Sequence, residues 1–240
     1  MQFENKHAVI TGGTNGIGRC IAETFLREGA AVTIIDIYNR KIDGTTFYHG
    51  DIADKSVIES FTNTITQPVD YLINNACIGR GGLLSDCSYE DFEYVQRVGV
   101  TAPYYLTSLL LRKNLFAPSA AVVNTASTRA FQSQPDTEAY SAAKGGIVAL
   151  THSMAVSLAG RVRVNCISPG WIETSPTPEH SEQDKHQHPS GRVGTMSDIA
   201  EMVLYLCSDK AGFINGENIT IDGGMNKLMI YHGDCGWELK

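Results

Sequence analysis

The sequence predicts an α/β fold, a doubly wound parallel sheet of about seven strands with helices on both faces, in a single domain. Short apolar runs, typical of buried strands, alternate with longer segments whose apolar residues recur at helical spacing. Strands that alternate with helices pair in parallel, and a parallel sheet must be covered on both faces. The length of 240 residues suits one such domain, and no internal repeat marks a second.

The first elements predict a strand, a turn, a helix and a second strand. The first strand covers residues 7–10 and ends at Thr11, and the helix continues at helical spacing to Leu26, with Gly29 as a plausible end. The second strand covers residues 31–35 and finishes at Asp36. The turn between the first strand and the helix has the sequence Gly12-Gly13-Thr14-Asn15-Gly16-Ile17-Gly18.

This unit predicts a dinucleotide site. Glycines permit close approach of the backbone to a pyrophosphate, and a helix N-terminus offers unpaired N–H groups to phosphates. Asp36, eighteen residues after Gly18, is placed to bind ribose hydroxyls. Its carboxylate would repel a 2′-phosphate and Ile37 supplies no cation, so NAD is expected rather than NADP. We interpret the nearby Arg19 and Arg40 as solvated surface charges.

The alternation continues along the chain. We expect further strands at 46–48, 71–74, 120–125, 163–167 and 218–221, and helices at 55–63, 89–112, 140–158 and 197–206. Pro103 predicts a kink or break in the long helix, because proline lacks the N–H that the helix needs. Ser197 is a suitable N-cap for the last helix.

Tyr140 and Lys144 are candidate catalytic residues. They lie four positions apart on a predicted helix, so their side chains share a face. A cation beside a phenol favours the ionised phenol, which lets a tyrosine donate or accept a proton at ordinary pH. Ser127, thirteen residues before Tyr140, is a candidate to hold the reacting oxygen. With a hydride carrier nearby, these residues predict interconversion of an alcohol and a carbonyl.

Several motifs in fixed order resemble those of the classical short-chain dehydrogenase/reductases over residues 5–226. They are Thr11-Gly12-Gly13-Thr14-Asn15-Gly16-Ile17-Gly18, Asp51-Ile52, Asn74-Asn75-Ala76-Cys77, Val122-Val123-Asn124-Thr125-Ala126-Ser127, Tyr140 with Lys144, Pro169-Gly170-Trp171-Ile172-Glu173-Thr174, and Asn218-Ile219-Thr220-Ile221-Asp222-Gly223-Gly224. The resemblance implies a Rossmann-type fold and an NAD(P)-dependent oxidoreductase acting on CH–OH groups.

The resemblance also implies the site. Catalysis falls to Ser127, Tyr140 and Lys144, with Tyr140 as the general acid/base. The implied cofactor-binding residues are Gly12, Thr14, Asn15, Gly16, Ile17, Gly18, Asp36, Asp51, Ile52, Asn75, Ala76, Tyr140, Lys144, Pro169, Gly170, Ile172 and Thr174.

Two positions depart from the family pattern. Cys77 stands where the family has glycine, and we expect a small side chain to be tolerated there. Gly99 stands where the family carries a catalytic asparagine that helps to hold a water linking the lysine to solvent. One hypothesis is that Gly99 leaves space for an extra water, so that Gly99→Asn raises turnover. The alternatives are a slow enzyme, another proton route, or a glycine that only eases helix packing.

Composition limits the class of protein. The net charge of −7 argues against nucleic acid as the main partner. The sequence has no apolar run of 18 residues and no signal-peptide core, so we expect no membrane span and a cytoplasmic location. Six cysteines are scattered without a C-x-x-C, and several lie in apolar runs, as reduced core thiols do.

Residues 173–191 are polar and irregular, and the resemblance implies a lid over the substrate. The segment is short and poor in large apolar residues, which disfavours a bulky steroid-like substrate. Its histidines, His180, His186 and His188, lack recognised metal-ligand spacing, so we interpret them as solvated and expect no metal. Four residues near the motifs are candidates to line the substrate pocket, and its arginines could bind an anionic group: Arg80, Arg129, Phe131 and Gln132.

Residues 226–240 form a C-terminal extension. Its Leu228, Met229, Ile230, Tyr231 and Trp237 are too apolar for a purely solvated tail. One hypothesis is that the extension packs across a subunit interface near a neighbour's substrate cleft, and the alternative is packing on its own subunit. By analogy with the family, which forms tetramers or dimers, a homo-oligomer is expected.

Three functions remain open at this stage. The first is an NAD-dependent alcohol dehydrogenase or ketone reductase acting on a small-molecule substrate. The second is a non-catalytic NAD-binding sensor or scaffold, which only Gly99 favours. The third is an epimerase or dehydratase, which usually has a longer substrate region than this chain. Sugars, polyols, hydroxy acids and small ketones all remain possible substrates.

Overall fold

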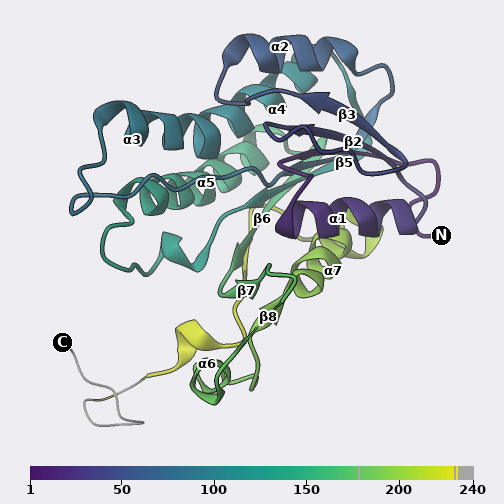
Figure 1. Cartoon of the computed structure of the whole chain (residues 1–240). Helices are drawn as coiled ribbons and strands as arrows, with labels where there is room; N and C mark the ends of the chain where they lie inside the picture. Colours follow the sequence, from purple (N-terminus) through teal and green to yellow (C-terminus); the bar gives the residue numbers. More distant parts are fainter. Residues whose placement is uncertain (178, 230, 232–240) are drawn as a thin grey trace.

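The computed structural model describes residues 1–177, 179–229 and 231. Figure 1 shows its central sheet with helices around it. The sheet has seven parallel strands in the order β3-β2-β1-β4-β5-β6-β9. The strands are β1 (His7–Thr11), β2 (Ala31–Asp36), β3 (Thr45–His49), β4 (Val69–Asn74), β5 (Phe116–Thr125), β6 (Val162–Pro169) and β9 (Asn218–Ile221). The chain winds outwards first from β1 and then from β4, which is the doubly wound arrangement. The predicted fold is therefore confirmed.

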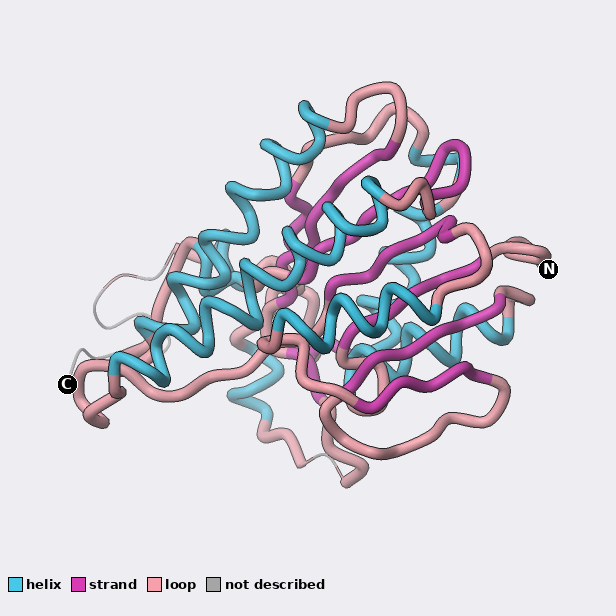
Figure 2. Tube along the Cα trace, turned by 90° about the horizontal axis from the view of Figure 1, so that it is seen from above, coloured by secondary structure: helices cyan, strands magenta, loops and turns pink. Residues whose placement is uncertain are grey.

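Helices cover both faces of this sheet, which Figure 2 shows from above. On one face lie α1 (Gly16–Arg27) and α7 (Met196–Cys207), and on the other lie α2 (Lys55–Thr64), α4 (Ala102–Arg112) and α5 (Glu138–Ser157), with α3 (Tyr89–Gln96) beside α5. Neighbouring residues of a strand supply opposite cores, since their side chains alternate between the faces. Ile34, for example, belongs to the core beneath α1 and α7, whereas Ile35 belongs to the other.

The long predicted helix is widened rather than broken. A π turn, η1 (Arg97–Thr101), joins α3 to α4, and the N–H of Ala102 donates to the carbonyl of Arg97, five residues before it. Pro103 follows in the first turn of α4. Because proline cannot donate a backbone hydrogen bond and its ring crowds the preceding turn, a wider turn just before it relieves the conflict.

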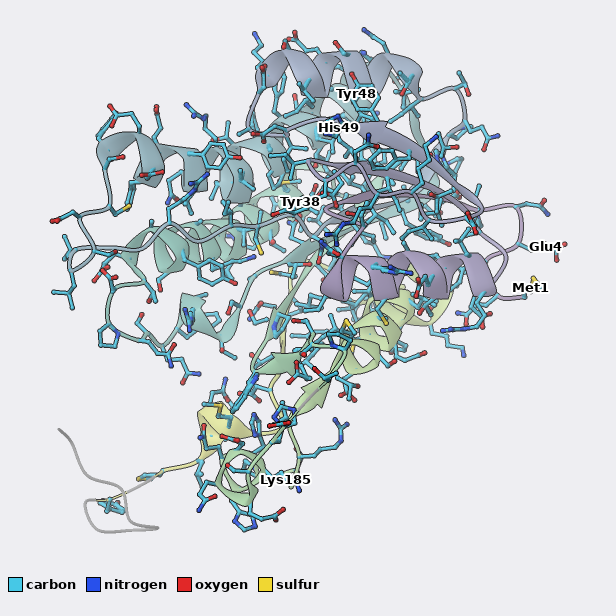
Figure 3. The ribbon with its side chains drawn as sticks, in the orientation of Figure 1. Met1, Glu4, Tyr38, Tyr48, His49 and Lys185 are labelled. Carbon is cyan, nitrogen blue, oxygen red and sulfur yellow. The ribbon has the colours of Figure 1, made fainter. Side chains whose placement is uncertain are left out.

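The segment after β6 is more regular than the sequence analysis expected. It contains a parallel pair, β7 (Ile172–Glu173) with β8 (Gly194–Thr195), and a short helix, α6 (Glu182–His186). Ser181 caps α6, since its Oγ accepts from the Asp184 N–H at 3.1 Å and the Asp184 carboxylate accepts in return. The helix projects from the rest of the domain, as the position of Lys185 shows (Figure 3).

The predicted N-cap of α7 at Ser197 is wrong. The N-cap is Thr195, whose N–H and hydroxyl donate to Asp198 at 2.7 and 2.8 Å. Arg192 also donates two 2.7 Å hydrogen bonds to this carboxylate and holds the pKa of Asp198 well below its usual value. Asp198 stands three residues into the helix, so it completes a capping box only with Thr195. The remaining short helices are η2 (Thr128–Ala130), η3 (Asp209–Ala211) and η4 (Met225–Lys227).

Other expectations have mixed outcomes. Cys166 and Cys207 are buried thiols, as predicted, and burial raises the pKa of Cys166 to about 11. No helix in the part of the chain that the structure describes is long and apolar enough to cross a membrane. Leu228 and Met229 are exposed, while residues 230 and 232–240, with Cys235 and Trp237, lie outside the described residues. The interface hypothesis for the C-terminal extension therefore stays a prediction.

Candidate active site

A cavity of about 740 Å³ opens at the carboxyl ends of the sheet strands, where β1 and β4 lie side by side and the strand order reverses. Such a switch point is where open α/β sheets bind ligands. All the predicted site residues except Thr14 line it. The remaining lining residues are Ile35, Ile37, Tyr38, Gly50, Cys77, Ile78, Arg80, Tyr94, Val98, Thr125 and Ala126.

The glycine-rich turn has no room for side chains. A Cβ on Gly18 would lie 2.1 Å from the carbonyl oxygen of Gly12 and 2.4 Å from Nδ2 of Asn75. Asn75 Nδ2 donates to that same carbonyl at 2.9 Å, so this amide ties the turn to the end of β4. Gly12 and Gly16 have φ values of +64° and +50°, a region that other residues rarely adopt. The turn therefore brings bare backbone to the cavity.

The N-terminus of α1 is open to an anion. Its N-cap Asn15 makes no side-chain capping bond, and the first turn contains no acidic residue. The first backbone N–H groups thus remain available beside the cavity. Asn15 Oδ1 instead accepts from Arg40 Nη1 at 2.8 Å, a contact that the solvated-charge interpretation of Arg40 did not foresee. Arg19 is exposed, as expected, and pairs with Glu23 at 2.7 Å.

Asp36 is held in place by backbone and side-chain donors. Asp36 is only 6% exposed, and its Oδ2 accepts hydrogen bonds from the backbone N–H and the hydroxyl of Thr14 at 3.0 and 2.7 Å. Oδ1 accepts from the Tyr38 N–H at 2.9 Å. Thr14, which is itself buried and does not line the cavity, therefore orients the Asp36 carboxylate.

Asp51 has a partner that no sequence motif marks. The Tyr94 hydroxyl donates to Oδ2 of Asp51 at 2.8 Å, and the Ala53 N–H donates to Oδ1 at 2.8 Å. Burial and this bond to Asp51 raise the pKa of Tyr94. The Arg80 guanidinium lies 5.2 Å from the centre of the Tyr94 ring and 3.8 Å from Asp91. Sequence reasoning missed Tyr94, which is one of many aromatic residues on predicted helices.

The three predicted catalytic residues line the same cavity. Tyr140 lies in the first turn of α5, and Lys144 one turn later is only 3% exposed, with Nζ 5.4 Å from the centre of the Tyr140 ring. Nζ donates to the Thr125 carbonyl at 2.6 Å, at the end of β5. Ser127 follows this strand, and its Oγ accepts from the Arg129 N–H at 3.2 Å. The Ser127 hydroxyl donates no hydrogen bond among the described residues, so its proton can be directed into the cavity.

Gly99 lies in the π turn against α5. A Cβ on Gly99 would lie 2.9 Å from the Cβ of Ala143, the residue before Lys144. Gly146 makes a similar approach on the same side of α5, where a Cβ would lie 3.0 Å from Val100. The structure thus supplies a packing reason for a glycine at this position.

The residues expected at the substrate end differ in their placement. Arg129 lies beside Tyr140, with its guanidinium carbon 5.8 Å from the ring centre. Phe131 is 62% exposed and Gln132 is also exposed, and neither these two residues nor Arg129 line the cavity. Arg80 does line it, at the Tyr94 end.

The histidines of the lid segment are not all solvated. His188 is only 2% exposed, with its ring centre 6.0 Å from that of Trp171, so the expectation of a solvated side chain is wrong for it. His180 lies 3.1 Å from Glu173, and His186 is exposed. Within the described ranges, no group of three or more histidine, cysteine or acidic residues could hold a metal ion.

Comparisons with known proteins agree with this geometry. A family model described as enoyl-(acyl carrier protein) reductase matches residues 12–226. An uncharacterized oxidoreductase of Thermotoga maritima is 43% identical, over 95% of this chain and 99% of that protein. A solved apo SCOR enzyme from Clostridium thermocellum is 46% identical with a TM-score of 0.91, covering 98% of this chain and 99% of that one.

A further solved structure, a 4-hydroxyisoleucine dehydrogenase complexed with NADH, is 28% identical with a TM-score of 0.84, over 94% of this chain and 100% of that one. The family match spans most of the described residues, and the relatives match over nearly their whole length. Together with the glycine turn, the strand order and the Tyr140–Lys144 pair, these matches show that the chain belongs to the short-chain dehydrogenase/reductase family, a family of NAD(P)-binding oxidoreductases.

Proposed function

We propose that the protein is an NAD-dependent dehydrogenase or ketone reductase that interconverts an alcohol and a carbonyl. The observation that carries this proposal is the meeting of Ser127, Tyr140 and buried Lys144 in one cavity, with Lys144 Nζ 5.4 Å from the centre of the tyrosine ring. A serine donor, a phenol and a fixed cation are the groups that proton transfer to and from a reacting oxygen requires.

The residues around the cavity fit a nicotinamide dinucleotide. The bare turn at Gly12 and Gly18 and the uncapped N-terminus of α1 suit a pyrophosphate. Asp36, with Oδ1 taking only the Tyr38 N–H among the hydrogen bonds described, keeps capacity for ribose hydroxyls. Its carboxylate supports NAD over NADP, because a 2′-phosphate beside it would be repelled. The relative solved with NADH supports the same preference.

The proposed mechanism assigns one task to each side chain. A bound nicotinamide would supply the hydride acceptor for oxidation of the alcohol and the hydride donor for reduction of the carbonyl. Ser127 donates its free hydroxyl proton to the substrate oxygen, and Tyr140 accepts the alcohol proton during oxidation and returns it during reduction. Lys144, anchored on the Thr125 carbonyl, places its ammonium beside the phenol ring of Tyr140.

The surrounding parts of the proposal follow from the family and from the sequence. We propose a single domain over residues 1–240, a lid at 173–191 that closes over a small-molecule substrate, and an extension at 226–240. We also propose a homo-oligomer, a cytoplasmic location, and no role in binding nucleic acid, membranes or metal. Gly99 favoured a non-catalytic sensor, but its contact with Ala143 gives that glycine a packing reason, so the sensor has no feature of its own to support it.

Turnover across alcohols, sugars and hydroxy acids, followed by NADH absorbance, tests the proposal. Tyr140→Phe is expected to lower turnover at least about 100-fold, since general acid–base catalysis contributes about 10²- to 10⁴-fold. Tyr104→Phe, at an exposed position of α4, is the matched control and should keep its activity. Binding of NADH should survive in both variants. Near-normal turnover in Tyr140→Phe contradicts the assignment, and NADH binding without any turnover favours the sensor.

A further inference from the structure

Resting on the proposed function, we propose that the substrate carries a carboxylate and that Arg129 binds it. The protein would then interconvert a hydroxy acid and the corresponding oxo acid, in preference to a neutral alcohol and ketone. In the oxidative direction, the C–H bond of the alcohol carbon breaks, and its hydrogen would leave with both bonding electrons as a hydride to a bound NAD⁺. The hydroxyl proton passes to Tyr140, a C=O bond forms, and the carboxylate is unchanged.

The position of Arg129 carries the first step of this argument. It lies in the short helix η2, which follows β5, and its backbone N–H donates to Oγ of Ser127 at 3.2 Å. Its guanidinium carbon lies 5.8 Å from the centre of the Tyr140 ring. Arg129 therefore adjoins both residues that the mechanism places on the reacting oxygen. A carboxylate bound by its guanidinium would lie beside the Ser127–Tyr140 pair.

The charge of Arg129 carries the second step. Among the described residues, no carboxylate lies within ion-pair distance of its guanidinium, whereas Arg80 and Arg97 each pair with an acidic side chain. The side-chain acceptor that it meets is Oε1 of Gln134, a neutral amide that orients the guanidinium without neutralising it. A planar guanidinium presents five donors and matches a carboxylate in a bidentate manner. An unneutralised cation in a chain of net charge −7 is therefore poised for an anion.

Arg80, which lines the cavity as Arg129 does not, is nonetheless a poorer candidate. It lies 3.8 Å from Asp91, so its charge already has a partner. It also stacks on Tyr94, whose hydroxyl donates to Asp51. Asp51 is one of the cavity residues that the family resemblance assigns to cofactor binding. Arg129 is therefore the arginine that would bind a substrate carboxylate near the reacting carbon.

The test compares each acid with its own uncharged form. Initial rates with NAD are measured on 2-, 3- and 4-hydroxycarboxylates and on their methyl esters, using wild type, Arg129→Gln, Arg129→Lys and the control Arg112→Gln, which changes an exposed arginine on α4. Wild type should prefer one acid over its ester in kcat/KM. Arg129→Gln should lower kcat/KM for that acid by about 10- to 100-fold, the loss expected for a charge-assisted hydrogen bond. The ester should change little, and Arg129→Lys should recover part of the loss.

Equal use of acid and ester by wild type, or loss of acid and ester activity together in Arg129→Gln, overturns the proposal. A binding measurement separates it from simple misfolding: the oxo acid should bind the NADH complex of wild type and Arg112→Gln, but not that of Arg129→Gln. The proposed function fails differently. Turnover of neutral alcohols with indifference to Arg129 overturns only the carboxylate, whereas no turnover of any alcohol, acid or ester overturns both.

Discussion

Replacing Gly99 by alanine tests a close contact between the π turn and α5, one residue away from Lys144 of the proposed catalytic site. The added Cβ would lie 2.9 Å from the Cβ of Ala143. Carbon atoms pack best at about 3.5–4.0 Å, so the π turn and α5 must move apart by roughly 1 Å. Neither methyl group can rotate away, because each is fixed to its backbone. Lys144 follows Ala143 directly, so the same movement should displace the Lys144 ammonium from its place beside Tyr140.

The magnitude follows from two opposing effects. Overpacking a well-packed core costs about 1–3 kcal/mol. Glycine to alanine within a helix gains about 0.5–1 kcal/mol. Gly99→Ala should therefore lower the free energy of unfolding by about 1–2 kcal/mol. Ala143→Gly alone should also destabilise, by about 1 kcal/mol, through helix propensity. In the double variant the clash is absent. Its free energy of unfolding should therefore be about 1–3 kcal/mol higher than the value obtained by adding the two single changes to wild type.

Urea unfolding of wild type, the two single variants and the double variant measures this coupling. Turnover should fall in Gly99→Ala and recover in the double variant, because removing the Ala143 methyl group lets Lys144 return. Strictly additive stabilities, or a Gly99→Ala protein more stable than wild type, would refute the contact. The same contact predicts that the larger Gly99→Asn lowers turnover, opposite to the sequence-based hypothesis of an extra water.

Two further predictions concern the turn and the sheet. Gly18→Ala should abolish NADH binding in a fluorescence titration and destabilise by about 3 kcal/mol or more, because its Cβ would lie 2.1 Å from the Gly12 carbonyl oxygen. The control Gly145→Ala lies in α5, where an added Cβ meets nothing within 4 Å, and should raise the free energy of unfolding by about 0.5–1 kcal/mol. Equal effects of alanine at Gly18 and at Gly145 would contradict the steric explanation. Burial lowers the pKa of His7, so the unfolded chain takes up its proton first and stability should fall below about pH 6.5. The free energy of unfolding, measured at pH 7.5, 6.5 and 5.5, should fall less with decreasing pH in His7→Gln than in wild type. The control His186→Gln, at an exposed position, should show the same fall as wild type. A fall in His7→Gln equal to that of wild type would count against a role of His7 in the pH dependence.

Much of the site could be predicted because its signals are local. The strand, glycine turn and helix at residues 7–27 follow from short-range spacing, and Tyr140 and Lys144 meet because a helix repeats every 3.6 residues. The boundaries were less predictable. The sequence placed the cap of α7 at Ser197, whereas Asp198 selects Thr195 through a capping box, and the polar composition of the lid hid the short helix α6.

The sequence by itself determined the order along the chain of the seven strands of the main sheet and of the long helices between them, the glycine-rich turn, and the pairing of Tyr140 with Lys144, because each depends on residues close together in the chain. Only the tertiary structure decided that Tyr94 holds Asp51, 43 positions away, and that Gly99 packs on Ala143. It likewise placed Arg129 beside Tyr140. Contacts of this kind depend on which strands become neighbours and on how the helices cross them. The distance between two such side chains cannot be read from the number of residues that separates them along the chain.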